Sequence, residues 1–248
     1  MKQFKITGLL FFAASVFFLT SCGGNSNEKT TATDSTAATD TTAKAPAPAP
    51  ASTIVTTPQN MVIITHKVAN YAKWKVAYEA HDSARQAAGL HNYVIGRGMM
   101  DSNMVMVALK VDDTAKAKAF GKSPGLKAAM QKAGVVGAPM ISIITATWQD
   151  TATLTTKLRS RTMFTVKDWD AWQKSFEEGK QERIDNGITV RVISHDLNDT
   201  KKVSLVTAVV DTAKAFAYYK SDALKKRRAA GGVVGEPVRF LFNIAQRY

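Results

Sequence analysis

Apolar positions change their period several times along the chain, and each change predicts a secondary-structure element. Residues 61–66 are mostly branched and apolar at consecutive positions, over the length of a strand. From residue 71 to about residue 88, large side chains recur every three or four positions, the period of a helix, and Gly89 supplies a left-handed stop. Residues 91–100 and 104–111 flank a short polar turn, so we predict a hairpin there.

A second helix and a last strand complete the unit. The helix begins near residue 113, and Ser123-Pro124 interrupts it because proline fits the first turn of a new helix but not a helix interior. Gly134 ends the helix, and the last strand is expected to open at Pro139 and run to residue 147. The order strand, helix, strand, strand, helix, strand is that of a ferredoxin-like unit, an antiparallel sheet with both helices on one face.

The same unit occurs twice, without a gap, at an offset of 98 residues. Asp-Thr-Ala-Lys-Ala at residue 113 recurs at residue 211, and Gly-Val-Val-Gly at residue 134 recurs at residue 232. Roughly a quarter of about 88 paired positions are identical, far above chance for an ungapped match. We therefore predict a tandem duplication, with ferredoxin-like repeats over residues 59–149 and 156–248.

Three predicted strands of the first repeat are apolar at consecutive positions rather than at alternate ones: residues 61–65, 105–111 and 141–146. Strands of this kind are covered on both faces. Helices cover one face, and the second repeat is the obvious cover for the other. The predicted fold class is therefore α+β, with two βαββαβ repeats that close an intramolecular α+β barrel, and we expect a monomer that is internally a pseudo-dimer.

This pattern resembles the dimeric α+β barrel superfamily, which includes antibiotic-biosynthesis-type monooxygenases, haem-degrading monooxygenases, stress-responsive barrel proteins and small cyclases. The resemblance rests on the element order, the broken second helix, Trp74 and Trp172 in the first helices, and the Gly-Val-Val-Gly-x-Pro turn. It covers both repeats and specifies a fold rather than a reaction. It implies a substrate pocket between sheet and helices. The second-helix histidine typical of the haem-degrading branch is missing, so no haem is expected.

The first residues of the sequence predict where in the cell the protein is located. Residues 1–21 combine two lysines with a short apolar run, as in a secretory signal peptide. The ending Leu-Thr-Ser-Cys22 resembles the lipobox of bacterial lipoproteins, which implies cleavage before Cys22 and its lipidation. Residues 22–58 are rich in Thr, Ala and Pro and predict a disordered tether. We expect a lipid-anchored protein of the bacterial cell envelope, periplasm-facing or in the outer membrane.

The net charge of +13 belongs mainly to the two repeats. Nucleic acid is not expected as a partner of an exported, lipidated protein, whereas anionic lipid headgroups or an anionic ligand suit the address. The densest basic cluster is residues 225–228, Lys-Lys-Arg-Arg, which aligns with Lys-Ala-Ala-Met in the first repeat, so the fold does not require it. A solvated helix face is the simpler interpretation of that cluster.

Positions where the repeats disagree are better functional candidates than positions they share. His66 aligns with Phe164, which indicates a buried or half-buried site where a histidine needs a partner or a ligand. His81, His91 and His195 are expected to line the same pocket between sheet and helices. The full set of ligand-binding candidates is His66, Trp74, Tyr78, His81, Arg97, Trp172, Arg191 and His195. An aromatic-lined pocket could be supplied by residues 66, 74 and 78 or, alternatively, by residues 169, 172 and 191 of the second repeat, and plain core packing is the competing interpretation.

These residues leave three functions open. The leading hypothesis is binding of a small apolar or anionic molecule without turnover and without a cofactor. The first alternative is a cofactor-independent monooxygenase or cyclase with His66 as the base. The second is a structural or interaction module at the membrane surface. No metal is expected, because no two histidines have a compact ligand spacing and the only cysteine is Cys22.

Overall fold

The computed structural model describes residues 52–248. The predicted signal peptide, Cys22 and most of the predicted tether lie outside these residues. The last part of the predicted tether contains a short strand, β1 (Ile54–Val55), which pairs with Gln149 and Asp150. Both of its residues are branched or apolar types that favour a strand. Within the described part of the chain, no helix has the length and apolarity that a membrane crossing requires.

Two consecutive βαββαβ units follow β1, as predicted. The first comprises β2 (Gln59–Val68), α1 (Tyr71–Ala80), α2 (Asp82–Ala87), β3 (Leu90–Gly98), β4 (Met104–Val111), α3 (Thr114–Gly121), α4 (Pro124–Lys132) and β5 (Val135–Asp150). The second comprises β6 (Leu158–Val166), α5 (Trp169–Glu178), α6 (Lys180–Asp185), β7 (Ile188–Asp196), β8 (Lys202–Val209), α7 (Thr212–Lys220), α8 (Asp222–Ala230) and β9 (Val233–Arg247).

Side-chain caps and glycines define the ends of the helices. The side chain of Asn70 accepts the amide N–H of Lys73 at the start of α1. Ser123 caps α4, whose first residue is Pro124, so the break between α3 and α4 is confirmed. Gly89 ends the first helical segment with a φ of 69°, a left-handed conformation that favours glycine.

The prediction of one helix over residues 71–88 is wrong in one respect. The segment breaks at His81, whose φ and ψ of −97° and 14° are not helical. The guanidinium of Arg85 donates to the carbonyl oxygen of Tyr78, which competes with the helical hydrogen bond to that oxygen. The second repeat breaks in the same place, at Gly179, and Arg183 donates to the equivalent carbonyl, that of Phe176.

The last strand of each repeat also differs from the prediction, because β5 begins at Val135, before Pro139. Pairing with β2 passes from Thr65 opposite Met140 to Lys67 opposite Val136, so a bulge accommodates residues 137–139. Proline has no N–H for the sheet and is tolerated in a bulge. The bulge therefore lies opposite residue 66.

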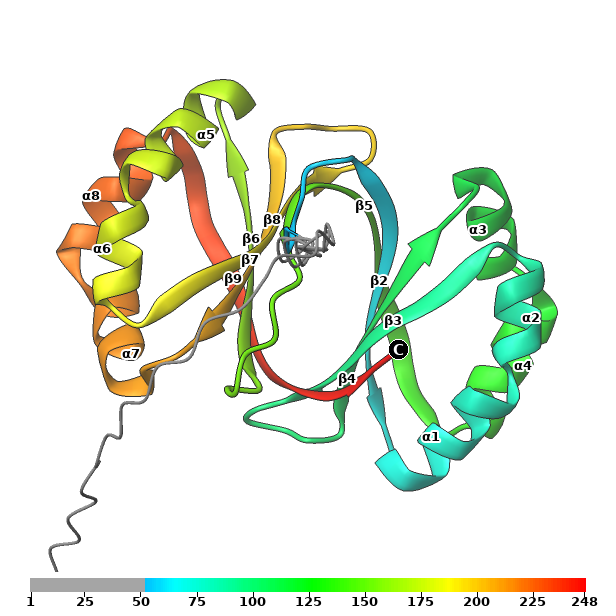
Figure 1. The fold of residues 1–248 in the computed structure, drawn as a ribbon. Helices are drawn as coiled ribbons and strands as arrows, with labels where there is room; N and C mark the ends of the chain where they lie inside the picture. Colours follow the sequence, from blue (N-terminus) through cyan, green and yellow to red (C-terminus); the bar gives the residue numbers. More distant parts are fainter. Residues whose placement is uncertain (1–51) are drawn as a thin grey trace, which may run out of the picture. The chain divides into compact units, whose positions relative to one another are not determined.

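The two repeats close one barrel. The strands follow the order β1-β5-β2-β4-β3-β9-β6-β8-β7, and β7 pairs in turn with β5. The second strand of each repeat thus pairs with the last strand of the other: β3 pairs with β9, and β7 pairs with β5. Helices α1–α4 cover the outside of one half and α5–α8 the outside of the other (Figure 1). The predicted intramolecular barrel is confirmed.

Strand β2 shows why these strands are apolar on both faces. Val62 packs in the core between the sheet and the helices of the first repeat. Its neighbours Met61 and Ile63 pack inside the barrel, with Phe242 of the second repeat. Alternate residues of a strand point to opposite faces, so both faces of this sheet are buried.

Gly96 allows a close approach at the β3–β9 seam, and replacing it tests the importance of that seam. A methyl group at this position would overlap the ring of Phe242, which is buried inside the barrel. We expect Gly96→Ala to lower the free energy of unfolding by about 1–3 kcal/mol, the usual cost of overpacking a core. Urea unfolding followed by tryptophan fluorescence measures this change.

Gly125→Ala is the matched control, because an added methyl group there contacts nothing and alanine favours the helix. Equal stabilities of the two variants would show that the seam does not constrain residue 96.

Candidate ligand-binding site

A cavity of about 270 Å³ lies between the sheet and the helices of the first repeat. Strands β2, β4 and β5 form its floor, and all four helices of the repeat contribute to its walls. Most of the lining is aliphatic or aromatic. The lining residues used below are His66, Trp74, Tyr78, His81, Arg85, Phe120, Gly121 and Ala129.

His66 is the polar group in the floor of this cavity. Its side chain lies on the same face of β2 as Val62, opposite the bulge in β5, and the residue is 6% exposed. Neither Nδ1 nor Nε2 has a hydrogen-bond partner among residues 52–248. Burial lowers the pKa of the imidazole from 6.5 to about 4, so the ring is neutral at neutral pH. A buried polar group without a partner costs about 1–3 kcal/mol, which a ligand that bonds to it would recover.

Aromatic rings form the wall beside His66. The ring of Trp74 stacks on that of Tyr78 with 4.9 Å between centroids, and it lies 5.6 Å from the imidazole of His66. Trp74 and Tyr78 are one turn apart on α1 and therefore face the same side of the helix. On the other side of the cavity, His81 lies 6.0 Å from the ring of Phe120.

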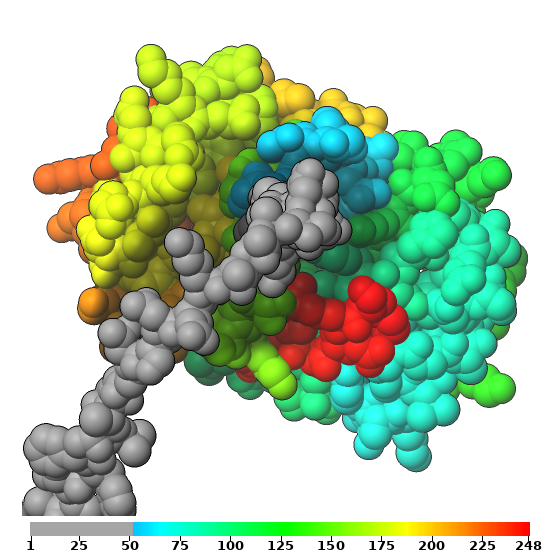
Figure 2. Space-filling model, viewed as in Figure 1, coloured from blue at the N-terminus to red at the C-terminus, as the bar shows by residue number. Residues whose placement is uncertain are grey.

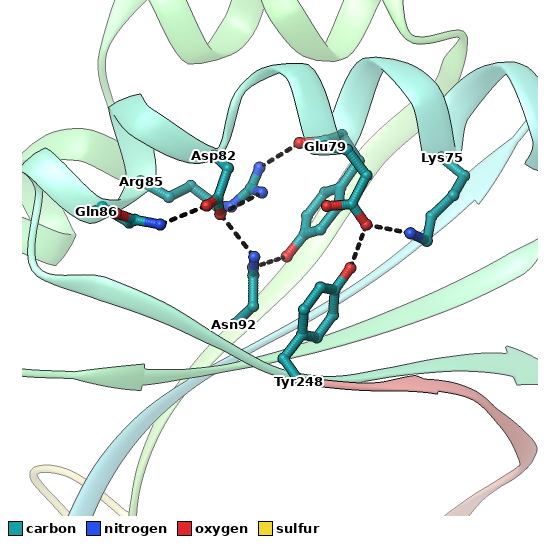
Figure 3. Close-up of polar contacts among 8 residues, drawn as sticks. Lys75, Glu79, Asp82, Arg85, Gln86, Asn92 and Tyr248 are labelled. Atoms are coloured by element: carbon teal, nitrogen blue, oxygen red, sulfur yellow. Dashed lines mark hydrogen bonds and ion pairs between the residues drawn. The ribbon is translucent and has the colours of Figure 1, made fainter.

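A polar network holds the Tyr78 wall in place (Figure 3). The Tyr78 hydroxyl donates to Asn92, and the amide of Asn92 donates to Asp82 at 2.6 Å. The guanidinium of Arg85 lies 3.7 Å above the Tyr78 ring and pairs with Asp82 at 3.0 Å. Burial raises the pKa of Tyr78 well above its ordinary value, so the hydroxyl stays protonated. Most of these polar atoms bond to one another; among the cavity-lining residues, the buried atoms without a partner are both ring nitrogens of His66 and the Nε of Arg85.

The C-terminus of the chain braces the outside of the same helix. The Tyr248 hydroxyl donates to Glu79 of α1, which also pairs with Lys75 (Figure 3). The backbone N–H of Tyr248 donates to the carbonyl of Tyr93 on β3. Figure 2 shows the C-terminal residues lying against the first repeat. The second repeat therefore helps to fix the helix that carries Trp74 and Tyr78.

The equivalent space in the second repeat is smaller, at about 90 Å³. Phe164 replaces His66, and its ring packs edge-on against Trp172. Larger side chains also enter from the helices, because Tyr219 stands where the first repeat has Gly121 and Arg227 where it has Ala129. The first repeat therefore has smaller side chains and an open cavity where the second has larger ones. It also has an imidazole where the second has the apolar ring of Phe164.

The basic cluster at residues 225–228 divides into two parts on α8. Lys225 and Lys226 are exposed, as a solvated helix face requires. Arg227 instead binds the carboxylate of Glu182 at 3.0–3.1 Å, and Arg228 lines the small cavity. The interpretation of all four residues as a solvated face is therefore wrong for the two arginines.

The structure brings together four of the predicted site residues: His66, Trp74, Tyr78 and His81 all line the larger cavity. Trp172 lines the smaller one. Arg191 lines neither, because it points into the barrel interior, so the expected pocket of residues 169, 172 and 191 is wrong.

The other predicted residues lie away from the cavities between sheet and helices. Arg97 covers the ring of Tyr71 at 4.0 Å, and His195 packs edge-on against Trp169 at 5.0 Å. Arg97 and His195 are equivalent at the offset of 98 residues. Each packs on the aromatic residue that begins α1 or α5, so each covers the start of a helix. His91 is exposed and pairs with Asp112. The expected gathering of four histidines is therefore wrong.

Three lining residues were not singled out from the sequence. Arg85 supports Tyr78, and Gly121 and Ala129 leave the space open. The difference between the repeats at residues 121 and 129 carries this signal, because both small residues align with large ones. Among residues 52–248, no group of three His, Cys, Asp or Glu side chains is placed to hold a metal ion.

Comparisons with known proteins bear on the fold. No protein-family model matches the sequence, and no curated protein matches it. An anthrone oxidase-like protein shares 12% identity and a TM-score of 0.54, over 79% of this chain and 95% of that one. A protein provisionally named a monooxygenase, from Fusobacterium nucleatum subsp. nucleatum, shares 12% identity with a TM-score of 0.50. The match covers 76% of this chain and 93% of that protein's chain. The chain has the fold of the dimeric α+β barrel proteins, and a single chain supplies both halves of the barrel.

Proposed function

We propose that the first repeat binds a small, mainly apolar molecule in the cavity above His66, without chemical turnover. The observation that carries this proposal is a buried imidazole with two unpartnered nitrogens at the floor of a mainly apolar space. A neutral imidazole donates one hydrogen bond and accepts another. The ligand class is therefore an apolar molecule with a hydroxyl, amino or carbonyl group that reaches His66.

The size and lining of the cavity favour an organic ligand over water. A single buried water needs roughly 10–15 Å³ and two to four polar partners. The cavity offers about 270 Å³, the Tyr78 hydroxyl is engaged by Asn92, and Arg85 bonds through its terminal nitrogens while its Nε has no partner among residues 52–248. An apolar ligand would fill this space and gain the contacts that an empty cavity lacks.

Binding is favoured over the alternative of a monooxygenase or cyclase reaction. A catalytic base works best with a pKa near the operating pH, whereas burial holds that of His66 near 4. Catalysis also requires a second polar group that orients the imidazole, and none lies within hydrogen-bond distance among residues 52–248. The cavity itself argues against a purely structural module.

We also propose that lipid on Cys22 holds the protein at the bacterial cell envelope and that the two repeats arose by tandem duplication. The lipobox-like ending of the predicted signal peptide supports the first part. The identical positions at a constant offset support the second. A ligand-binding domain on a tether would then sample molecules close to the membrane surface.

Substitutions at residues 66 and 121 test the cavity as a binding site. With 1-aminoanthracene, a neutral apolar fluorophore with one amino group, we expect saturable binding to the wild-type protein. His66→Phe should weaken binding about tenfold, the equivalent of one hydrogen bond of about 1.4 kcal/mol. Gly121→Tyr should abolish most of it, because the second repeat fills its own cavity with tyrosine at this position. Fluorescence titration measures both effects.

Gly125→Ala, outside the cavity lining, is the control and should bind like the wild type. Unchanged affinity together with higher stability in His66→Phe would identify the histidine as a core residue only. Native mass spectrometry of gently purified protein then reports the natural ligand that remains bound.

The pKa of His66 predicts how stability depends on pH. As the pH falls below 6.5, the unfolded chain takes up a proton at residue 66, and the folded protein does so only near pH 4. Wild-type stability should therefore fall between these values, by about 2 kcal/mol from pH 7 to pH 5 beyond the fall in His66→Phe. Urea unfolding of both ligand-free proteins across this range measures the difference. Parallel curves would mean that the imidazole is solvated in the folded protein.

Intact-mass measurement of membrane-purified protein tests the anchor. We expect a mass that lacks residues 1–21 and carries added acyl groups. Cys22→Ser should remove the lipid and release the protein from the membrane fraction, because a single predicted attachment point is lost. An unmodified Cys22 thiol in the membrane-bound wild type would contradict the proposal.

A further inference from the structure

The barrel interior is a second, separate space whose lining is unequal between the halves. A cavity of about 70 Å³ lies there, and all eight strands from β2 to β9 contribute to its walls. The first repeat supplies mainly apolar side chains, among them Met61, Ile63 and Met106. The second repeat supplies Arg159, Arg161, Arg191, Ser204 and Arg247.

The inequality is sharpest on the first strand of each repeat. At the offset of 98 residues, Arg159 occupies the position of Met61, and Arg161 that of Ile63. Both arginines are almost fully buried, at 2% and 3% exposed. The fold needs no charge at these positions, since the first repeat fills them with apolar residues.

The buried charges are not balanced by the residues around them. Arg191 pairs with Asp150 at 2.6 Å. Arg159 donates only to the backbone carbonyls of Thr156 and Leu158, and neither it nor Arg161 pairs with a carboxylate among residues 52–248. Burying such a charge is unfavourable unless it is paired, and Asp150 is the one carboxylate in the cavity lining.

Arg161 has the arrangement of a residue prepared for a ligand. Its Nε donates to the hydroxyl of Ser204 at 3.0 Å, and one terminal nitrogen donates to the hydroxyl of Ser142 at 3.2 Å. These bonds hold the guanidinium in place and engage only part of its five N–H donors. Burial lowers the pKa of Arg161 to about 10, so the group is still charged at neutral pH.

We propose that the barrel interior binds a small oxyanion, phosphate-like or carboxylate, at the free N–H donors of Arg161, in the cavity whose lining also includes Arg159. Arginine suits this ligand because its planar fork matches two oxygens at once. The volume of about 70 Å³ corresponds to roughly five waters, the size range of such an anion. This site lies on the opposite face of the sheet from His66 and does not depend on the function proposed for that residue.

A second cleft adjoins the interior cavity. A more open cleft of about 370 Å³ shares Ile144, Arg161 and Ser204 with the interior cavity. The cleft also carries Lys202 together with the carboxylates of Asp196 and Glu236. The cleft is thus of mixed charge, whereas the interior is cationic.

Thermal unfolding of the full-length protein in inorganic phosphate tests the site. The wild-type Tm should rise linearly with the logarithm of phosphate concentration above the dissociation constant, relative to potassium chloride of equal ionic strength. Arg159→Met and Arg161→Ile, which import the residues of the first repeat, should lose this dependence. Both should also unfold at a higher temperature than the wild type without phosphate, because an unpaired buried charge is gone. Lys226→Met, on the exposed surface, should respond like the wild type.

The proposal would be overturned if the Tm of the wild type and of both arginine variants depended equally on phosphate concentration. It would also be overturned if phosphate and potassium chloride of equal ionic strength changed the wild-type Tm by the same amount. If the variants do not fold, wild-type crystals grown with selenate decide the question. An anomalous peak in the interior cavity beside the guanidinium of Arg161 supports the site, and its absence at saturating selenate refutes it.

Discussion

Closure of the barrel is the constraint on which the rest of this structure depends. Each repeat has strands that are apolar on both faces and a sheet with an open edge. Strands of this kind are normally covered on both faces, and open edges are normally paired or protected. The β3–β9 and β5–β7 pairings give each open edge a partner, while Met61 and Ile63 become buried against the second repeat. Both pairings follow the same register at an offset of 98 residues. The residues shared by the repeats are accordingly those that shape helices and turns.

Closure leaves the cavities between sheet and helices free to differ. Each of these cavities is built by one repeat, so a change in one does not alter the packing of the other. The first repeat keeps Gly121 and Ala129 and places His66 below an open space. The second fills the same space with Phe164 and Tyr219. Two repeats of the same architecture therefore contain an open cavity and a nearly filled one.

A single chain also permits an asymmetric barrel interior. In a symmetric dimer, every residue of the lining appears twice, so buried arginines would be doubled. Here Arg159 and Arg161 face the apolar positions of the first repeat rather than copies of themselves. The number of uncompensated charges inside the barrel is halved, and all four arginines of the lining come from the second repeat.

Much of the fold was predictable, because its determinants are local or periodic. Proline at residue 124, the caps at Asn70 and Ser123 and the glycine stops define element ends within a few residues of themselves. The break at His81 was not predictable in this way. It depends on the Arg85 side chain reaching back to a carbonyl of its own helix, which periodicity does not encode.

The sequence alone determined the repeat, the order of the elements and the burial of the strands on both faces. It also indicated a buried polar site at residue 66, because His66 aligns with Phe164. All four follow from patterns along the chain. Only the tertiary structure decided which candidates share a space. Pairing in the sheet sends alternate residues to opposite faces, so His66 faces the helices while Arg159 and Arg161, on the equivalent strand, face the barrel. Whether a buried polar group has a partner depends on every element packed around it, and a linear pattern does not specify that.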